Sequence, residues 1–243
     1  MSLPTSSSSS SSPATPPPTP QDHNQSVADP IAHFRSIPWC AALLASDPPG
    51  APAAVTVTVP DRRPLASGES SFVRKTLNSG STVRACVTWL RPAASTSPTS
   101  PTSPASPASA PASERFLRGE DDGKDEDELL LFPVFSALLD LGADLNSYVG
   151  TMHGGLYGVL MDEVMGTAAK LQSPHGAYTV RFQTDYRRQI RPPQVVLVRG
   201  RVTRREGRKL FVRGTIEDED GNIMAEGSGL WLSMGKNVGR SQL

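Results

Sequence analysis

Two adjacent acids interrupt an otherwise apolar stretch in the second half of the chain. Residues 150–166 read Gly-Thr-Met-His-Gly-Gly-Leu-Tyr-Gly-Val-Leu-Met-Asp-Glu-Val-Met-Gly, which places Asp162 and Glu163 in the middle of a predicted helix. A carboxylate removed from water is costly unless it is paired or used, so an acid on a buried helix is a candidate for catalysis. Asp162 is the candidate general base or nucleophile. Glu163 faces another side of the helix, where pairing with an arginine is the competing interpretation.

The same helix is preceded by His153, Gly154 and Gly155, which predict a sharp turn at its start. N–H groups in the first turn of a helix lack partners within the helix and carry the positive end of its dipole. Such groups can cradle a developing negative charge, so the turn predicts an oxyanion site. The competing interpretation is structural: the glycines allow close packing, and His153 shapes the turn by a hydrogen bond.

Strand-forming sequences flank this helix, which is predicted over 154–171. Residues 82–90 are rich in strand-forming side chains, and the apolar stretch 129–146 is expected to pair with them as a hairpin. Four extended segments separated by turn residues follow the helix: 177–188, 194–205, 208–219 and 222–234. One helix followed by a meander of strands predicts an α+β fold in which an antiparallel sheet wraps around one central helix.

Low-complexity sequence divides the remaining chain. We predict a disordered Ser/Pro-rich tail at 1–28, a helix-and-strand extension at 29–92, a disordered Ser/Pro-rich and acidic insert at 93–128, and the core at 129–235. The tail and the insert cannot bury enough apolar surface to offset chain entropy. Within the extension, Asp29 and Pro30 indicate a helix start, and residues 55–59 alternate as a strand or extended edge.

Composition excludes several classes of protein. The formal net charge is +0, which argues against a nucleic-acid partner. Cys40 and Cys86 are the only cysteines, and their surroundings give no zinc pattern. No apolar run is long enough to span a bilayer, and no secretory or mitochondrial leader is recognised. We therefore expect a cytoplasmic protein without a metal site.

The motif and the segments after it resemble a known family. His153-Gly154-Gly155 is followed by Leu160-Met161-Asp162-Glu163, by a strand that carries Thr179 and Tyr186, and by the hairpin at Gly207-Arg208-Lys209. This pattern resembles the HGG-type branch of the hotdog-fold thioesterase superfamily, which includes phenylacetate-pathway enzymes. The resemblance covers roughly 130–234 and implies a hotdog fold. It also implies hydrolysis of an acyl thioester, usually acyl-CoA, without a cofactor.

The resemblance implies a role for each site residue. The Gly154 N–H polarises the thioester carbonyl, and Asp162 acts as general base or nucleophile. Thr179 positions water, and His153 orients the loop or the substrate carbonyl. The competing interpretation of Thr179 is an ordinary strand residue. Four further residues are candidates for substrate binding: Gly155, Glu163, and the neighbours Asn146 and Ser147, which both stand near the position where relatives carry a polar residue.

Helix geometry predicts that the site needs two chains. Nine residues of helix advance about 13 Å and turn about 900°, which we interpret as placing Gly154 and Asp162 far apart on opposite faces. A symmetric dimer can pair Gly154 of one chain with Asp162 of the other. Relatives are similarly built as dimers. We therefore predict a homodimer, or a homotetramer made of dimers, with sites at the interface.

Other interpretations stay open at this stage. The chain is alternatively an acyl-carrier-protein thioesterase, an enzyme with dehydratase-like activity on the same fold, or a non-catalytic acyl-binding or scaffold dimer. Residues 29–75 either cover the sheet or acyl channel, or extend the core. A basic set either coats solvated strands or binds coenzyme A phosphates: Arg181, Arg187, Arg188, Arg191, Arg204, Arg205, Arg208 and Lys209.

Overall fold

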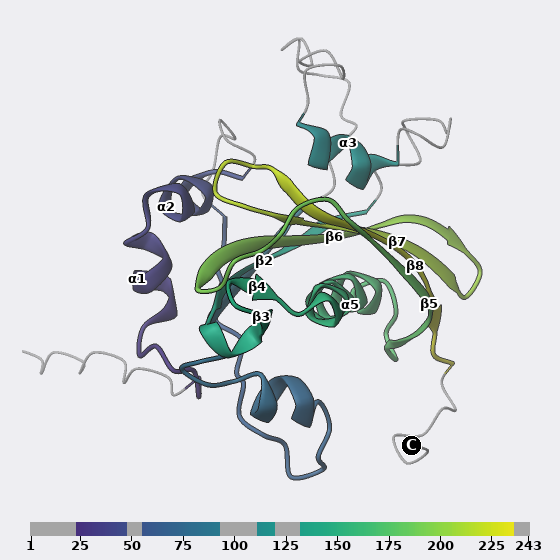
Figure 1. The fold of residues 1–243 in the computed structure, drawn as a ribbon. Helices are drawn as coiled ribbons and strands as arrows, with labels where there is room; N and C mark the ends of the chain where they lie inside the picture. The colour runs from purple at the N-terminus through teal and green to yellow at the C-terminus, as the bar shows by residue number, and fades with distance from the viewer. Residues whose placement is uncertain (1–22, 48–54, 93–110, 120–131, 236–243) are drawn as a thin grey trace, which may run out of the picture.

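A six-stranded antiparallel sheet wraps around one long helix. The computed structural model describes residues 23–47, 55–92, 111–119 and 132–235, and the helix is α5 (Gly154–Lys170). Figure 1 shows α5 on the concave side of the curled sheet. The strands lie in the order β1-β2-β6-β7-β8-β5. Their bounds are Val83–Arg91 for β1, Val134–Leu141 for β2, Ala177–Tyr186 for β5, Gln194–Glu206 for β6, Lys209–Glu217 for β7 and Ile223–Ser233 for β8.

This arrangement is the predicted α+β hotdog fold. The predicted hairpin of the first two strands is confirmed, because β1 and β2 pair antiparallel from Val83 opposite Leu141 to Arg91 opposite Val134. The four extended segments predicted after the helix form β5 to β8. The turns between them use residues with a left-handed backbone, Gly207 at φ 57° and Gly221 at φ 73°, where a side chain would be strained.

Close approach of α5 to the sheet explains two strand glycines. A Cβ on Gly214 of β7 would lie 2.6 Å from the sulfur of Met165, and one on Gly200 of β6 would lie 3.0 Å from the Met165 Cα. The helix therefore rests directly on the backbone of the central strands. Met161 and Met165 are fully buried there, so the apolar side of α5 is committed to the core.

The stretch 129–146 is not one strand. Within the described residues, β2 ends at Leu141, and the 3-10 turn η4 (Ala143–Leu145) follows it. The short hairpin of β3 (Asn146–Tyr148) and β4 (Thr151–Met152) then leads into α5. The break comes at Gly142, where a Cβ would lie 2.4 Å from the backbone of Ser81. Only glycine allows this close approach of the two chain segments, which the apolar composition alone does not reveal.

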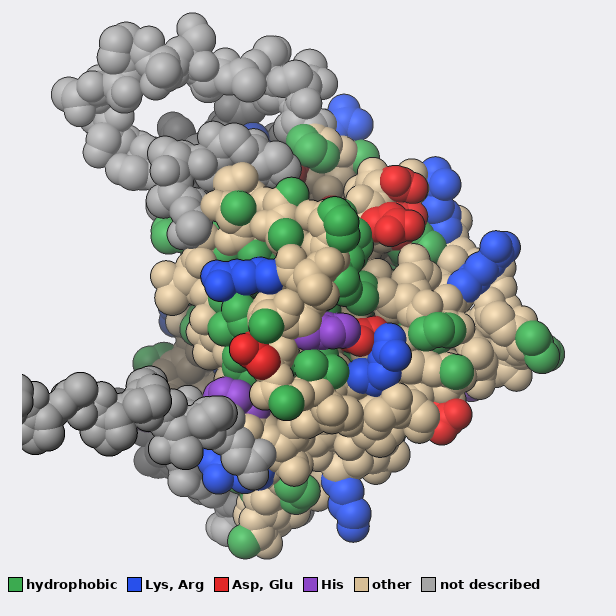
Figure 2. Space-filling view, turned by 90° about the vertical axis from the view of Figure 1, so that its left-hand side faces the viewer, with side chains coloured by type: hydrophobic (Ala, Val, Ile, Leu, Met, Phe, Trp, Pro, Cys, Tyr) green, Lys and Arg blue, Asp and Glu red, His purple; other side chains and the backbone are tan. Residues whose placement is uncertain are grey.

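The N-terminal extension covers the outer face of the sheet. Helices α1 (Pro30–Arg35) and α2 (Pro38–Ala45) bury Phe34 and Leu44 against Trp89 and Leu138 in a second apolar cluster. The predicted helix start is confirmed, because the Asp29 side chain accepts a hydrogen bond from the Ala32 N–H at 2.9 Å. Figure 2 shows the side of the molecule that carries these helices, with charges of both signs mixed among hydrophobic side chains. No described helix has the length and apolar character needed to cross a membrane.

The outer edge of β1 is covered by the same extension. Thr58 forms a single antiparallel bridge with Thr88, so the expected strand at 55–59 is reduced to one bridge in an extended chain. The predicted tail 1–28 is only partly outside the described residues, which begin at 23. Gln25 accepts a hydrogen bond from the Cys86 N–H at 2.7 Å and donates to the Cys86 carbonyl at 3.2 Å. This amide takes the place of a neighbouring strand, which explains why residues 23–28 are fixed rather than disordered.

Part of the predicted insert is also ordered. Residues 93–110 and 120–131 lie outside the described residues, but α3 (Ala112–Arg118) packs on β6 and β7. The disorder prediction for 93–128 is therefore wrong for this helix. Leu117 is fully buried and Glu114 is 6% exposed. Leu117 gives this helix an apolar contact, and Glu114 gives it ion pairs with Arg91 and Arg199.

A buried ion network fastens α2, α3 and the sheet together. The Arg199 guanidinium on β6 donates to Glu114 at 2.6 Å and to Asp47 at 3.0 Å, and lies 3.8 Å from Glu217. Arg91 also donates to Glu114 at 2.8 Å. Burial alone would raise the pKa of Glu114, but hydrogen bonding to Arg91 and the charges of Arg91 and Arg199 hold it below the ordinary value.

Replacement of Arg199 by leucine is expected to destabilise the fold by about 3–5 kcal/mol, because it leaves three buried carboxylates without their shared cation. Arg205 on the same strand is exposed and donates only to carbonyls. Its replacement by leucine should change the free energy of unfolding by no more than about 1 kcal/mol. Urea unfolding of both variants checks this. Equal shifts of the two midpoints would contradict a stabilising role of the network.

Candidate active site

In the turn before α5, one glycine N–H donates a hydrogen bond, and the other meets no acceptor among the described residues. His153 is the N-cap residue, and its Nδ1 accepts a hydrogen bond from the Gly155 N–H at 3.0 Å. Gly154 occupies the first helical position, where no acceptor exists within the helix. Among the described residues no hydrogen-bond acceptor meets the Gly154 N–H. The arrangement therefore satisfies Gly155 and leaves the Gly154 N–H free to meet an incoming anion.

The His153 cap makes a testable contribution to stability. Its replacement by alanine is expected to cost about 1 kcal/mol of unfolding free energy, because the Gly155 N–H loses its acceptor. Asparagine is a favourable N-cap and should restore most of that loss. Thermal or urea unfolding of both variants measures the difference. If alanine and asparagine were equally destabilising, the imidazole would have a role other than capping.

Two tyrosines build the wall beside this turn. The Tyr186 hydroxyl of β5 donates to the Gly154 carbonyl at 3.1 Å. The Tyr157 hydroxyl accepts from the Ile190 N–H at 2.7 Å, and burial raises the pKa of Tyr157 above its ordinary value. The two rings meet edge to face with centroids 5.2 Å apart. Both residues line an open cavity of about 380 Å³ that also contains Gly154.

The structure brings Asp162 and Thr179, two separately predicted site residues, into direct contact. The Thr179 Oγ1 donates to Asp162 Oδ1 at 2.8 Å. Asp162 is half-buried on α5, whereas Thr179 is exposed on β5. This hydrogen bond fixes the orientation of the carboxylate and leaves its second oxygen available.

A bulge in β5 aims Thr179 at the helix. Phe182 and Thr184 face α5, because they are the nearest side-chain contacts of a Cβ placed on Gly158. In a regular strand Thr179 would point to the opposite face from these even-numbered positions. The pairing of β5 with β8 shifts register between Thr179 and Arg181. The extra residue turns Thr179 inward, as bulges beside functional sites often do.

The prediction that Gly154 and Asp162 lie on opposite helix faces is wrong. Gly154 neighbours Tyr186, Gly158 neighbours Phe182, and Asp162 bonds Thr179, so this stripe of α5 faces β5 throughout. Nine residues separate Asp162 from His153, but only eight separate it from Gly154. Eight residues advance about 12 Å and turn about 800°, which is two turns and 80°. Gly154 and Asp162 therefore lie on the same side of α5 but far apart along its axis.

The two candidate residues before the motif occupy different places. Ser147 is exposed and lines the same cavity as Gly154. Asn146 is half-buried in β3, and its Oδ1 is buried without a hydrogen-bond partner among the described residues. Ser147 thus meets the cavity directly, whereas Asn146 holds an unused acceptor beside it. Their roles in substrate binding stay predictions.

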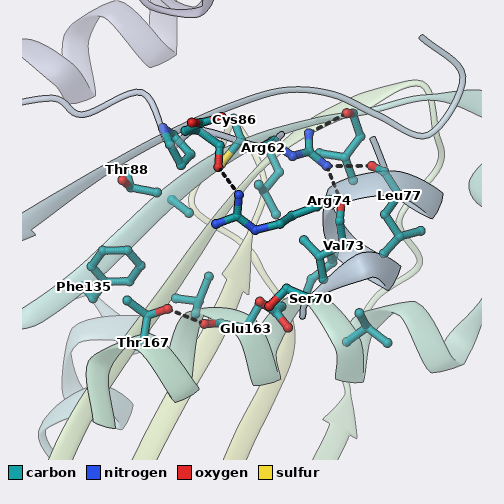
Figure 3. Close-up of a pocket in the computed structure, with 18 of the residues that line it drawn as sticks. Arg62, Ser70, Val73, Arg74, Leu77, Cys86, Thr88, Phe135, Glu163 and Thr167 are labelled. Carbon is teal, nitrogen blue, oxygen red and sulfur yellow. Dashed lines mark hydrogen bonds between the residues drawn. The ribbon is translucent and has the colours of Figure 1, made fainter. Parts of the chain in front are cut away.

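Glu163 lies apart from this group. It lines a second cavity, of about 330 Å³, between α5, β1, β2 and the π-helical turn η1 (Phe72–Thr76) (Figure 3). Glu163 is exposed, but partial desolvation still raises its pKa; the nearby Asp162 adds to the effect, whereas Lys170 and Arg74 oppose it. The structure therefore does not bring Glu163 together with Gly154. Sequence reasoning missed this cavity, because residues 60–77 carry no motif that points to one.

Some arginines of the predicted basic set form ion pairs with carboxylates, and others form none among the described residues. Arg187 bonds Glu226 at 2.6 Å, and Arg204 pairs with Glu206. Arg205 donates to two carbonyls. Arg187 and Arg188 line the cavity at Gly154 and so share it with the turn. The remaining members lie elsewhere on the strands and hairpins.

Comparison with known proteins identifies the superfamily that this part of the chain resembles. Residues 149–225 match the family model of the Thioesterase superfamily. The match runs from the turn before α5 into β8 and includes His153, Gly154, Asp162 and Thr179. The predicted resemblance to the hotdog-fold thioesterase superfamily is confirmed for this segment. The match is to the superfamily as a whole and does not distinguish its HGG-type branch.

Several solved structures are similar to the chain. A conserved protein from Pseudomonas aeruginosa is 30% identical, with a TM-score of 0.38, and the match covers 42% of this chain and 81% of that one. The Streptococcus mutans protein solved with acetyl-CoA is 18% identical (TM-score 0.40, 42% and 82% covered). PaaI from the phenylacetic acid degradation operon of Escherichia coli is 16% identical (TM-score 0.40, 42% and 73% covered). No curated protein sequence gives a significant match.

Proposed function

We propose that the chain is an acyl-CoA thioesterase that hydrolyses an acyl thioester to a free acid and a thiol. The observation that carries the proposal is the Asp162 carboxylate held by the Thr179 hydroxyl at 2.8 Å. It lies on the helix whose first N–H, that of Gly154, meets no acceptor among the described residues. The family match over 149–225 supports the same reaction class.

The proposed reaction uses the helix start as the oxyanion site. The thioester oxygen accepts a hydrogen bond from the Gly154 N–H, next to the positive end of the α5 dipole. Asp162 takes a proton from water, the water oxygen attacks the carbonyl carbon, and the thiolate leaves as the tetrahedral intermediate collapses. Alternatively, the Asp162 carboxylate attacks and forms a mixed anhydride that water opens. Thr179 is a positioning residue in both routes, because it orients the carboxylate.

We propose further that the complete site forms between two copies of the chain. Gly154 and Asp162 of one copy are about 12 Å apart along α5, too far to meet at one carbonyl carbon. Within the described sheet β5 is an edge strand that pairs with β8 only. Tyr178 and Val180 on β5 are 43% and 59% exposed. An exposed apolar edge of this kind suits strand pairing with a second copy, which would bring the two helices together.

The cavity at Gly154 suits the coenzyme end of the substrate. Arg187 and Arg188 stand at this cavity together with Ser147. Guanidinium groups bind phosphate oxygens well, because their planar array of donors matches the phosphate geometry. We therefore place the coenzyme A phosphates near these arginines in the proposed complex.

Release of free thiol from short, medium, long and aromatic acyl-CoAs tests the proposal. We expect turnover of at least one class by the full chain, and the preferred class identifies the acyl group. Release from acyl-carrier protein alone would favour the related enzyme of that substrate class. No release from any acyl thioester would overturn the enzyme proposal and leave an acyl-binding dimer.

A further inference from the structure

The cavity on the other side of α5 has an apolar interior and a charged lining. Its interior is formed by β1, β2 and α5, mainly by Val83, Phe135, Leu139, Leu160 and Val164. Its volume of about 330 Å³ falls within the range of about 300–1,000 Å³ typical of small-molecule sites. The turn η1 and the chain before it close one side. This closing segment belongs to the N-terminal extension and lies outside the 149–225 family match.

Cations outnumber carboxylates in this lining. Arg62, Arg74 and Lys170 line the cavity, as do Asp61 and Glu163. Asp61 is already bound by Arg63, which keeps the pKa of Asp61 at about 2. Three cations thus face one available carboxylate. An apolar chamber with this imbalance favours a ligand that is mostly hydrocarbon and carries negative charge.

Arg62 is a buried cation fixed by carbonyl groups. It is 5% exposed and donates to the carbonyls of Val83 at 2.8 Å and Leu77 at 2.7 Å. Among the described residues no carboxylate lies within ion-pair distance of its guanidinium. Burial lowers the pKa of Arg62 from its ordinary value. A buried charge without a counter-ion is costly, and an anion in the adjoining cavity would reduce that cost.

Arg74 is the cation best placed to contact a ligand. Its Nη1 donates to the carbonyls of Asp61 at 2.8 Å and Arg63 at 2.9 Å, which fixes the guanidinium. Among the described residues its Nη2 and Nε make no hydrogen bond, so the N–H groups of these two nitrogens remain for a planar acceptor such as a carboxylate. Figure 3 shows Arg74 reaching from η1 into the space between the sheet and α5, with Glu163 and Thr167 on the α5 side.

We propose that this cavity binds an aliphatic carboxylic acid. Its hydrocarbon chain lies between β1, β2 and α5, and its carboxylate is held by Arg74 and Lys170. This site is distinct from the proposed thioester site. Asp162 faces β5, whereas Glu163 lines this cavity. The two residues are neighbours in the sequence, and successive residues of a helix point about 100° apart. The proposal stands whether or not the chain hydrolyses thioesters.

Calorimetric titration of the full chain with decanoate tests the proposal, with 1-decanol as the uncharged probe of equal length. We expect saturable binding of decanoate and at least tenfold weaker binding of decanol. Arg74→Gln and Lys170→Gln should each weaken decanoate binding about tenfold, because each removes one charge-assisted contact. Lys75→Gln is the matched control, since Lys75 neighbours Arg74 and is exposed outside the cavity lining. Lys170 is exposed at the end of α5, so its variant remains informative if Arg74→Gln loosens η1.

Three results would overturn the proposal. The first is no saturable binding of decanoate by the unaltered chain. The second is equal affinity for decanoate and decanol. The third is decanoate binding that Arg74→Gln and Lys170→Gln both leave unchanged; if Asp162→Asn then abolishes it, the acid binds at the thioester site.

Discussion

Replacement of Asp162 by asparagine is expected to lower thioester turnover by about 10²–10⁴-fold. The amide has nearly the same shape and can still accept the hydrogen bond from Thr179, so the local structure should be kept. It cannot take a proton from water and is a poor nucleophile, so both proposed routes fail. Thiol release at saturating and limiting acyl-CoA measures the loss, and the unfolding midpoint verifies that the variant is folded.

Asp185 provides the matched control for this experiment. It lies on β5, is exposed, and accepts only a long contact of 3.4 Å from Gln183. Asp185→Asn makes the same chemical change on β5, at a position that alternates away from α5, and should leave turnover within about twofold. A folded Asp162→Asn variant with unaltered turnover would remove Asp162 from the mechanism.

Two substitutions at Thr179 distinguish the contribution of its hydroxyl group from that of its side-chain shape in the same thiol-release assay. Thr179→Val keeps the branched side chain and removes the donor to Asp162, whereas Thr179→Ser keeps the donor. If Thr179 is a positioning residue, valine should lower turnover and serine should restore most of it.

The regular part of the fold could be predicted from the sequence because its signals are local. The helix expected over 154–171 is Gly154–Lys170 in the structure, and the strand meander follows it as expected. Periodicity and turn residues identify such elements without knowledge of their neighbours. The resemblance identifies both Asp162 and Thr179 as site residues, but their direct hydrogen bond is a finding of the structure.

The remaining features depend on packing that no local pattern encodes. The bulge near Val180 sets which face Thr179 occupies, and a regular strand of the same composition would have turned it away. Helix α3 is short, lies between a Ser/Pro-rich sequence and an acidic run, and is fixed by Arg91 and Arg199 from distant strands. Arg62 and Arg74 become cavity residues only when the extension folds back over β1.

Replacement of Gly154 by proline is expected to lower turnover by about 10²–10³-fold, because it removes the one N–H assigned to the thioester oxygen. Proline is well tolerated at the first position of a helix, where its missing N–H costs no helical hydrogen bond. His153 has φ −59° and ψ 128°, a conformation that suits a residue before proline. The change therefore deletes the donor and leaves α5 intact.

Gly154→Ala is the control that keeps the N–H. Its Cβ would lie 3.7 Å from the Tyr186 hydroxyl, an ordinary contact, so most turnover should remain. If both variants lost activity equally, the space at Gly154 and not its N–H would be the essential property.

The same variant tests whether the site is shared between two chains. Gly154→Pro and Asp162→Asn should each be inactive alone. If the site pairs Gly154 of one chain with Asp162 of the other, a mixed dimer contains one site with both lesions and one site with neither. Unfolding and refolding the two variants together should then restore up to about one quarter of the original activity, since half of the dimers are mixed and each has one of its two sites intact. No recovery in a mixture shown to contain mixed dimers would contradict the shared site, because a site built within one chain gives two damaged sites in every dimer.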